Sequence, residues 1–368
     1  ITLTNRLYND GAGNDIILQN ADDVQLQRVE VYNTGKLILG GASTTPGTAL
    51  TGNVTQTSYI TANSDGTNMI GEVAGNVTLN NTNQIYRLGD FTSGGNFTFY
   101  NQDRTLILQG ALESTGGNVS VDSRDSLTVS STGTVSANAA TKGVILKASS
   151  NNWGYTANIQ GAISASSGGI SLTSPYGYVV TSGAGSLTTD GAVTIASAPN
   201  YANGQATNYS TTINAPVSAG VGGNNNISIT SAGTFSNNAT GTLTATGSVA
   251  IKTYWDGTYE RNLTLGGNVT AGIDGIKLTS SGTINQTGGV LSTTGTLSGP
   301  NQTGGNPSSG QPSARGAVTL MGDNEFGNMG PFYLYDEGQV AFNVRDVSGG
   351  LTLAGNIENS HGAIAITT

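Results

Sequence analysis

The sequence contains no cysteine and a single histidine, His361. These absences exclude disulfides, thiolate nucleophiles, thiolate metal sites and histidine clusters. Charged residues make up 10% of the 368 residues, and 13 basic against 22 acidic side chains give a net charge of −9 without a basic stripe. A polyanion would be repelled by such a chain. We therefore expect no cofactor, no metal site and no nucleic-acid partner.

Long apolar runs are also missing. No stretch approaches the roughly 20 apolar residues that a membrane-spanning helix needs, and no apolar segment near Ile1 has the character of a signal peptide. We therefore expect no membrane insertion. Because the sequence also begins without Met, we interpret it as an internal segment whose export signals lie outside it.

The chain is rich instead in glycine, with 55 residues, and in short apolar-x-apolar pairs that follow Gly or Asn. Early copies lie 20, 22, 25, 26 and 23 residues apart, and Thr or Ser usually stands between the two apolar residues. This alternation predicts short strands with one buried face. These copies begin at Val77, Phe97, Val119, Val144, Ile170 and Val193.

Further strands of the same kind lie between the copies. Between Val119 and Val144, residues 127–129 and 134–136 repeat the alternation, so three strands make one unit. Such a unit cannot close its own core, but stacked parallel coils give each strand a partner above and below. We therefore predict an all-β fold, a parallel β-helix of about 15 three-stranded coils. We expect it to run through residues 1–368 as one continuous monomeric segment.

A longer repeat is superimposed on the short one, because residues 54–121 resemble residues 284–366. The offset is 230 at the start and 241 to 245 later, so the second copy carries 241 − 230 = 11 extra residues. We assign this insertion to residues 299–315, which are rich in Pro, Gly and Ser and are expected to form a surface loop. The parent protein is thus predicted to be a tandem array.

Residues 14–18, 52–57 and 83–97 carry a resemblance to a known family. The most specific block is Asn…Ile…Leu-Gly-x-Phe over residues 83–91. In these segments the sequence resembles the filamentous-haemagglutinin-type adhesins of bacterial two-partner secretion. The resemblance implies a right-handed parallel β-helix, export through an outer-membrane transporter partner, and a secreted or cell-surface location.

Our first hypothesis for function is an adhesin segment that mediates attachment or cell–cell and biofilm aggregation, without chemistry. Its ligand would be a host or bacterial surface glycan or protein, or a matrix polysaccharide. A polysaccharide-binding or polysaccharide-degrading β-helix enzyme is the alternative, and an ice- or mineral-binding rod is a third. An enzyme of this kind needs clustered carboxylates, or Asp with Arg or Lys, on neighbouring coils. The closest charged groups here, in 122–125, 323–325 and 336–337, are scattered, so we expect no catalytic residues.

Aromatic residues occur in three long segments, 147–158, 196–212 and 252–262, each of which follows a copy of the short repeat. Their equivalent positions suggest either a row of ligand contacts or rings that fold back over glycine-rich coils. The candidate ligand-contacting residues are Trp153, Tyr155, Tyr201, Tyr209, Tyr254, Trp255 and Tyr259.

Two further patterns have ordinary structural explanations. Residues 10–17 partly match a calcium-binding nonapeptide, but one copy cannot build that site, so a turn is expected there. Asn-x-Ser/Thr triplets are frequent, and an asparagine just before a strand fits a turn residue as well as a glycosylation site. Such triplets begin at Asn53, Asn76, Asn96, Asn118, Asn208, Asn238, Asn262 and Asn268.

Overall fold

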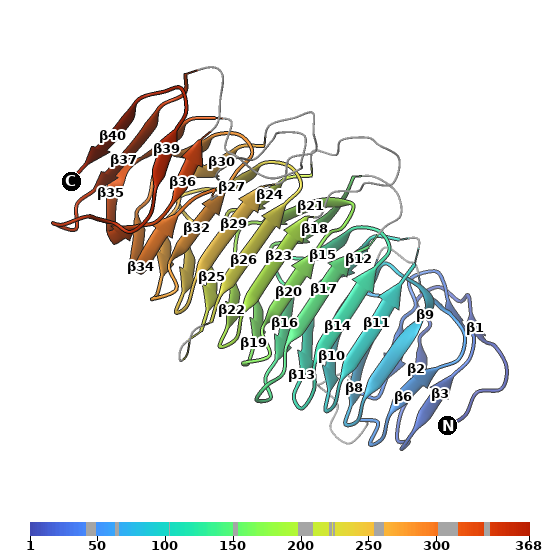
Figure 1. Ribbon diagram of the computed structural model, residues 1–368. Helices are drawn as coiled ribbons and strands as arrows, with labels where there is room; N and C mark the ends of the chain where they lie inside the picture. The colour runs from blue at the N-terminus through green and yellow to red at the C-terminus, as the bar shows by residue number, and fades with distance from the viewer. Residues whose placement is uncertain are drawn as a thin grey trace. The chain divides into compact units, whose positions relative to one another are not determined.

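The computed structural model describes residues 1–41, 49–62, 66–102, 104–149, 154–197, 209–220, 223, 225–253, 261–300, 316–334 and 339–368. Over these residues the fold is all-β, without a helix. Parallel strands stack as a β-solenoid, which confirms the predicted fold class (Figure 1).

The described residues make about 13 turns, slightly fewer than the predicted 15. The turn lengths show why. Asn96 lies one turn after Asn76, at a sequence separation of 20, whereas Ser231 faces Ser197 from the next turn at a separation of 34. Stacking fixes the strands, and the connections between them lengthen freely at low entropic cost. The short spacings near Val77 therefore overestimate the number of turns.

The chain divides into two compact units, one formed by Ile1–Ser174 and Ser182–Thr188 and the other by Pro175–Thr181 and Thr189–Thr368. The expectation of one continuous solenoid through residues 1–368 stays a prediction.

Strands of the first unit are short and follow one another closely along the chain. They are β1 (Leu7–Asn9), β2 (Ile16–Leu18), β3 (Val24–Leu26), β4 (Val29–Val31), β5 (Leu37–Leu39), β6 (Val54–Gln56), β7 (Ile60–Ala62), β8 (Met69–Val73), β9 (Val77–Ile85), β10 (Arg87–Ser93), β11 (Phe97–Asn101), β12 (Leu106–Leu108), β13 (Ala111–Ser114), β14 (Val119–Ser123), β15 (Leu127–Val129), β16 (Thr134–Ala137), β17 (Val144–Ala148), β18 (Tyr155–Ile159), β19 (Ile163–Ala165), β20 (Ile170–Thr173) and β22 (Leu187–Thr189).

The second unit is built in the same way and ends with one long strand, β35, followed by short ones. Its strands are β21 (Gly177–Thr181), β23 (Val193–Ser197), β24 (Thr211–Ile213), β25 (Val217–Ala219), β26 (Ile227–Ser231), β27 (Phe235–Asn237), β28 (Leu243–Ala245), β29 (Val249–Thr253), β30 (Leu263–Leu265), β31 (Val269–Ala271), β32 (Ile276–Thr279), β33 (Ile284–Gln286), β34 (Leu291–Ser298), β35 (Val318–Met329), β36 (Phe332–Leu334), β37 (Phe342–Asp346), β38 (Thr352–Leu353), β39 (Ile357–Asn359) and β40 (Ile364–Thr367).

The core consists of apolar side chains stacked in register from turn to turn. Phe97 of β11, Val119 of β14, Val144 of β17 and Ile170 of β20 face one another in sequence, and each is at most 2% exposed. These four strands lie side by side in Figure 1. The intervening Ser120 points outward and is half-buried. Alternation in the sequence thus produces an inner column of apolar side chains. Its burial stabilises the fold by about 25 cal/mol for each Å² of apolar surface removed from water.

A ladder of asparagine side chains runs along the turns that precede these strands. The Asn53 side-chain oxygen accepts the Asn76 N–H at 2.9 Å, and the Asn76 oxygen accepts the Asn96 N–H at 2.9 Å. Asp23 begins the ladder by accepting the Asn53 N–H, and Asn118 continues it. These Asn-x-Ser/Thr asparagines therefore occupy turns, where their side chains satisfy backbone donors of the next coil.

The two long-repeat copies form the same strand pairs. Val54 faces Val77 in β6 and β9, and the aligned Ile284 faces Val318 in β33 and β35. One turn later, Phe97 faces Val119 in β11 and β14. Phe342 and Ile364 are the corresponding pair in β37 and β40. The sequence similarity between residues 54–121 and 284–366 thus corresponds to one structural module present in each unit.

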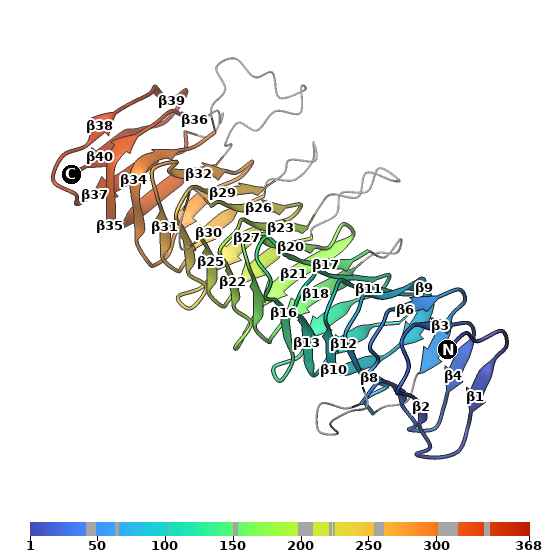
Figure 2. The same ribbon diagram turned by 90° about the horizontal axis from the view of Figure 1, so that it is seen from below.

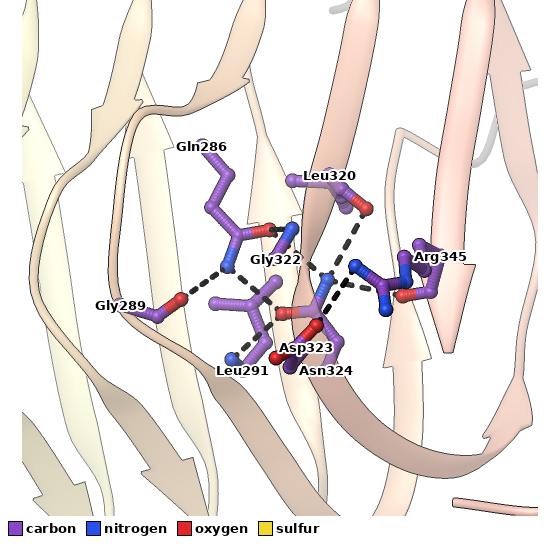
Figure 3. A network of polar contacts seen from close by, with 8 residues as sticks. All are labelled: Gln286, Gly289, Leu291, Leu320, Gly322, Asp323, Asn324 and Arg345. Carbon is purple, nitrogen blue, oxygen red and sulfur yellow. Dashed lines mark hydrogen bonds and ion pairs between the residues drawn. The ribbon is translucent and has the colours of Figure 1, made fainter. Parts of the chain in front are cut away.

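A buried amide network marks each copy of this module. In the second copy, the Gln286 and Asn324 side chains exchange two hydrogen bonds of 2.9 and 3.0 Å (Figure 3). The Asn324 oxygen also accepts the Leu291 N–H at 2.9 Å, and its amide group donates to the carbonyls of Leu320 and Arg345. All the donors and acceptors of the fully buried Asn324 side chain are therefore used.

The first copy repeats this network position by position. Gln56 and Asn83 exchange two hydrogen bonds of 2.5 and 3.2 Å, and the Asn83 oxygen accepts the Ile60 N–H at 3.0 Å. The Asn83 amide group donates to the carbonyls of Leu79 and Tyr100. The paired amides lie where the pairing of β9 with β11 and of β35 with β37 shifts register. Since a buried polar group without partners is costly, they satisfy the groups that regular pairing leaves free there.

Candidate functional site

A sheet at the start of the first unit carries the most elaborate surface cluster among the described residues. β1, β4 and β7 pair in parallel, with Tyr8 facing Glu30 and Glu30 facing Thr61. β1 and β4 lie side by side at the blue end of the chain in Figure 2. Because side chains alternate along a strand, Arg28, Glu30 and Tyr32 project from the same side.

Glu30 is the centre of this cluster. Glu30 is 3% exposed, and one of its carboxylate oxygens accepts hydrogen bonds from Arg28 Nε and Nη2 at 2.8 and 2.6 Å. The Tyr59 hydroxyl donates to the same oxygen at 3.0 Å. Arg6 forms an ion pair with the other oxygen. Two guanidinium groups thus fix one buried carboxylate, while both arginine side chains remain partly exposed to solvent.

Aromatic rings surround this ionic centre. The Arg6 guanidinium lies 4.0 Å from the centroid of the Tyr8 ring, and that of Arg28 lies 5.0 Å from the centroid of Tyr59. The Tyr8 and Tyr32 rings are 5.9 Å apart and tilted by 58°. Tyr8 is 49% exposed. We call Arg6, Tyr8, Asp10, Arg28, Glu30, Tyr32 and Tyr59 the Glu30 cluster.

Glu30 is held in its ionised form. Burial alone would raise its pKa, but the hydrogen bonds from Arg28 and Tyr59 and the charges of both arginines lower the pKa below its usual value. Burial and the hydrogen bond to Glu30 raise the pKa of Tyr59. The Tyr8 hydroxyl donates a hydrogen bond to Asp10 at 2.8 Å, which raises the pKa of Tyr8. At neutral pH the Glu30 carboxylate is therefore ionised beside the neutral phenols of Tyr8 and Tyr59.

Two of the aromatic residues predicted as ligand contacts fall within the described part of the chain. Tyr155 begins β18 and is half-buried. Tyr209 is 5% exposed, and its ring packs edge-on against Tyr178 at 5.2 Å, as expected for a ring that covers a coil. The others, Trp153, Tyr201, Tyr254, Trp255 and Tyr259, lie outside the described residues, as do residues 301–315 of the predicted insertion.

Two of the three charged groups noted in the sequence form local ion pairs, and the third, 336–337, lies outside the described residues. Asp122 pairs with Lys147 at 3.2 Å and accepts a hydrogen bond from the Ser149 hydroxyl, and Asp323 pairs with Arg345 at 2.8 Å. Among the described residues, no group of three or more His, Asp or Glu side chains could hold a metal ion. That part of the chain also has no helix long and apolar enough to cross a membrane.

Sequence reasoning missed the Glu30 cluster. Its members come from three turns, and Tyr8, Glu30 and Thr61 stand in register although they are far apart in the sequence. A usable signal was nevertheless present. Residues 28–32 carry Arg, Glu and Tyr at alternate positions where most strands of this chain carry Thr or Ser.

Comparison with protein-family models, curated proteins and solved structures gives no significant match to this chain. The functional conclusions below therefore rest on the residues and their geometry.

Proposed function

We propose that this chain is a repeat segment of a bacterial adhesin, a β-solenoid scaffold that presents contact surfaces for attachment or cell–cell aggregation. Its location would be secreted or at the cell surface, after export through an outer-membrane transporter. The ligand would be a surface glycan or protein, or a matrix polysaccharide.

One observation carries this proposal: the two copies of the module share their interior and differ at the surface. The network of Gln56 and Asn83 recurs as that of Gln286 and Asn324. Tyr59, which binds Glu30, directly precedes the network residue Ile60, whereas Val290 directly precedes the equivalent Leu291. Repeat proteins display variable surfaces on a constant stacked core in this way.

The Glu30 cluster supplies a contact surface of the type that adhesion requires. Tyrosine and arginine are enriched where proteins bind other molecules, because they offer large contact areas together with hydrogen-bond donors. Glu30 fixes the two arginines before any ligand arrives, so less side-chain freedom is lost on binding.

Bead adhesion tests the proposal. Beads coated with the folded chain should adhere to bacterial or host cells, and beads coated with the core-disrupted variant Val121→Asp should not. The same chain incubated with polysaccharides should release no new reducing ends. Adhesion equal to that of uncoated beads, or release of new ends, would overturn the proposal.

A further inference from the structure

We propose that the Glu30 cluster binds a neutral polysaccharide, with the Tyr8 and Tyr32 rings as the stacking floor and the Arg6 and Arg28 guanidinium groups as hydrogen-bond donors. This inference rests on the proposed adhesive function and assigns a site and a ligand class to it.

The geometry of the Tyr8 and Tyr32 rings supports their role as the stacking surface. Tyr8 is 49% exposed, and the Tyr32 ring lies 5.9 Å away at an angle of 58°. Sugar rings carry apolar C–H faces that pack on aromatic faces, and tyrosine provides this area with little loss of conformational entropy. Two neighbouring rings offer contacts to adjacent sugars, which favours a polymer over a monosaccharide.

The ionic contacts of Arg6 and Arg28 leave hydrogen-bond donors for a ligand. A guanidinium group has five N–H donors. Arg28 directs Nε and Nη2 to Glu30, and Arg6 directs one Nη2 to the same carboxylate. The side chains of Arg28 and Arg6 are 44% and 43% exposed, so both have further N–H groups that can donate to sugar hydroxyls. Because Glu30 orients both groups in the free protein, these donors are preorganised.

The ligand class follows from the charge. Arg6 and Arg28 contribute two positive charges to the cluster, and Glu30 and Asp10 contribute two negative ones, so the cluster is neutral. The whole chain carries −9. A polyanion would be repelled by the chain without net attraction at the cluster, and a polycation would find both carboxylates already bonded. A polymer of neutral sugars meets neither obstacle.

The arrangement of the strands indicates the direction in which a bound polysaccharide would run. The N–H of Leu7 bonds to the carbonyl of Arg28, and the N–H of Val29 bonds to that of Tyr59. Arg6, Arg28 and Tyr59 therefore stand side by side, each directly before one of the adjacent strands β1, β4 and β7. Adjacent strands are about 4.8 Å apart. The polar and aromatic groups therefore form a row across the strands, along which an extended polysaccharide would run.

Native affinity electrophoresis tests the assignment. The folded chain is run in gels that contain dextran, soluble starch, galactomannan or xyloglucan, in gels with polygalacturonate, and in gels without polymer. We expect retardation by at least one neutral polymer. In solution-binding controls, added salt should leave the binding unchanged, because no net charge is involved.

The variants locate the site. The double substitution Tyr8→Ala and Tyr32→Ala should weaken binding at least tenfold, whereas Tyr178→Ala, which removes another exposed tyrosine in the second unit, should leave binding unchanged. Melting curves check folding, and the single variant Tyr8→Ser replaces the double variant if that one fails to fold.

Three outcomes would overturn the inference: no retardation by any neutral polymer, retardation by polygalacturonate alone, or equal binding by the folded tyrosine variants. If beads still adhere to cells in these cases, the proposed adhesive function stands and the site assignment fails. If a neutral polymer binds at the cluster but coated beads do not adhere, the site stands and the adhesive function fails.

Discussion

Gln286 and Asn324 exchange two side-chain hydrogen bonds inside the second unit, and Gln56 and Asn83 do the same inside the first. A carboxamide is both donor and acceptor, so two of them pair reciprocally and leave capacity for nearby backbone groups. Asn83 and Asn324 are both fully buried. A polar pair of this kind requires one defined geometry, because any other arrangement leaves buried groups without partners.

Replacing either buried asparagine by leucine should therefore destabilise the unit that contains it. Asn83→Leu leaves the Ile60 N–H and the Gln56 side chain without their partner, which costs about 2–4 kcal/mol. Asn324→Leu should have an effect of similar size. Urea unfolding measures both, with Asn80→Leu as the control because Asn80 is exposed. Wild-type stability in Asn83→Leu would show that the network is dispensable.

Charges placed in the apolar column should disrupt stacking. Val121 and Leu146 are fully buried and face each other in successive turns, so Val121→Asp or Leu146→Asp buries an unpaired carboxylate, at a cost of several kcal/mol. Thr78→Ala changes a half-buried outward residue and should be mild. Circular dichroism melting compares the three variants. Equal effects of all three substitutions would contradict the burial of Val121 and Leu146 in the apolar column.

The Glu30 cluster should make stability depend on pH in the acid range. Because the folded pKa of Glu30 is lowered, its ionic contacts contribute fully above the unfolded value of about 4.3 and are lost as the pH falls through the folded pKa. The variant Glu30→Gln lacks this contribution at every pH. The melting temperatures of wild type and variant should therefore differ at pH 7 and converge as the pH falls through the folded pKa of Glu30. A difference that grows in acid would contradict the ionised state of Glu30.

The asparagine ladder should contribute through acceptors rather than through amide identity. Asn76→Ala removes the acceptor of the Asn96 N–H, at a cost of about 1 kcal/mol. Asn76→Asp keeps an acceptor, as Asp23 does at the first rung, and should be less destabilising at pH 7. Urea midpoints of the two variants test this order. The reverse order would indicate that the Asn76 amide donor to Asn53 matters more.

The fold was predictable because one face of each strand is encoded locally. Alternation such as Val119-Ser120-Val121 identifies a buried and an exposed face without knowledge of the partner strand. The number of turns was overestimated because connections vary in length independently of the strands. The repeated sequence pointed to equivalence of Gln56 with Gln286, but pairing with Asn83 and Asn324 depends on residues 27 and 38 positions away.

The Glu30 cluster was much harder to predict. Arg28 and Glu30 are two residues apart in the sequence, but the cluster also requires Arg6 and Tyr59, which contact Glu30 from adjacent turns. Which residues of those turns face Glu30 depends on turn lengths that the sequence does not specify. The tryptophans at 153 and 255 favoured segments 147–158 and 252–262 instead, whereas the tyrosines and arginines in and beside β1, β4 and β7 resembled ordinary surface residues.

Hydrogen exchange at Ile60 and Leu291 tests most directly whether the two copies are one module used twice. Each N–H donates to the oxygen of a buried asparagine, at 3.0 and 2.9 Å. Both amides should be strongly protected. Asn83→Ala should speed exchange at Ile60 and leave Leu291 protected, and Asn324→Ala should speed exchange at Leu291 and leave Ile60 protected. Rapid exchange at either amide in the wild-type chain would contradict the repeated module on which the proposed function rests.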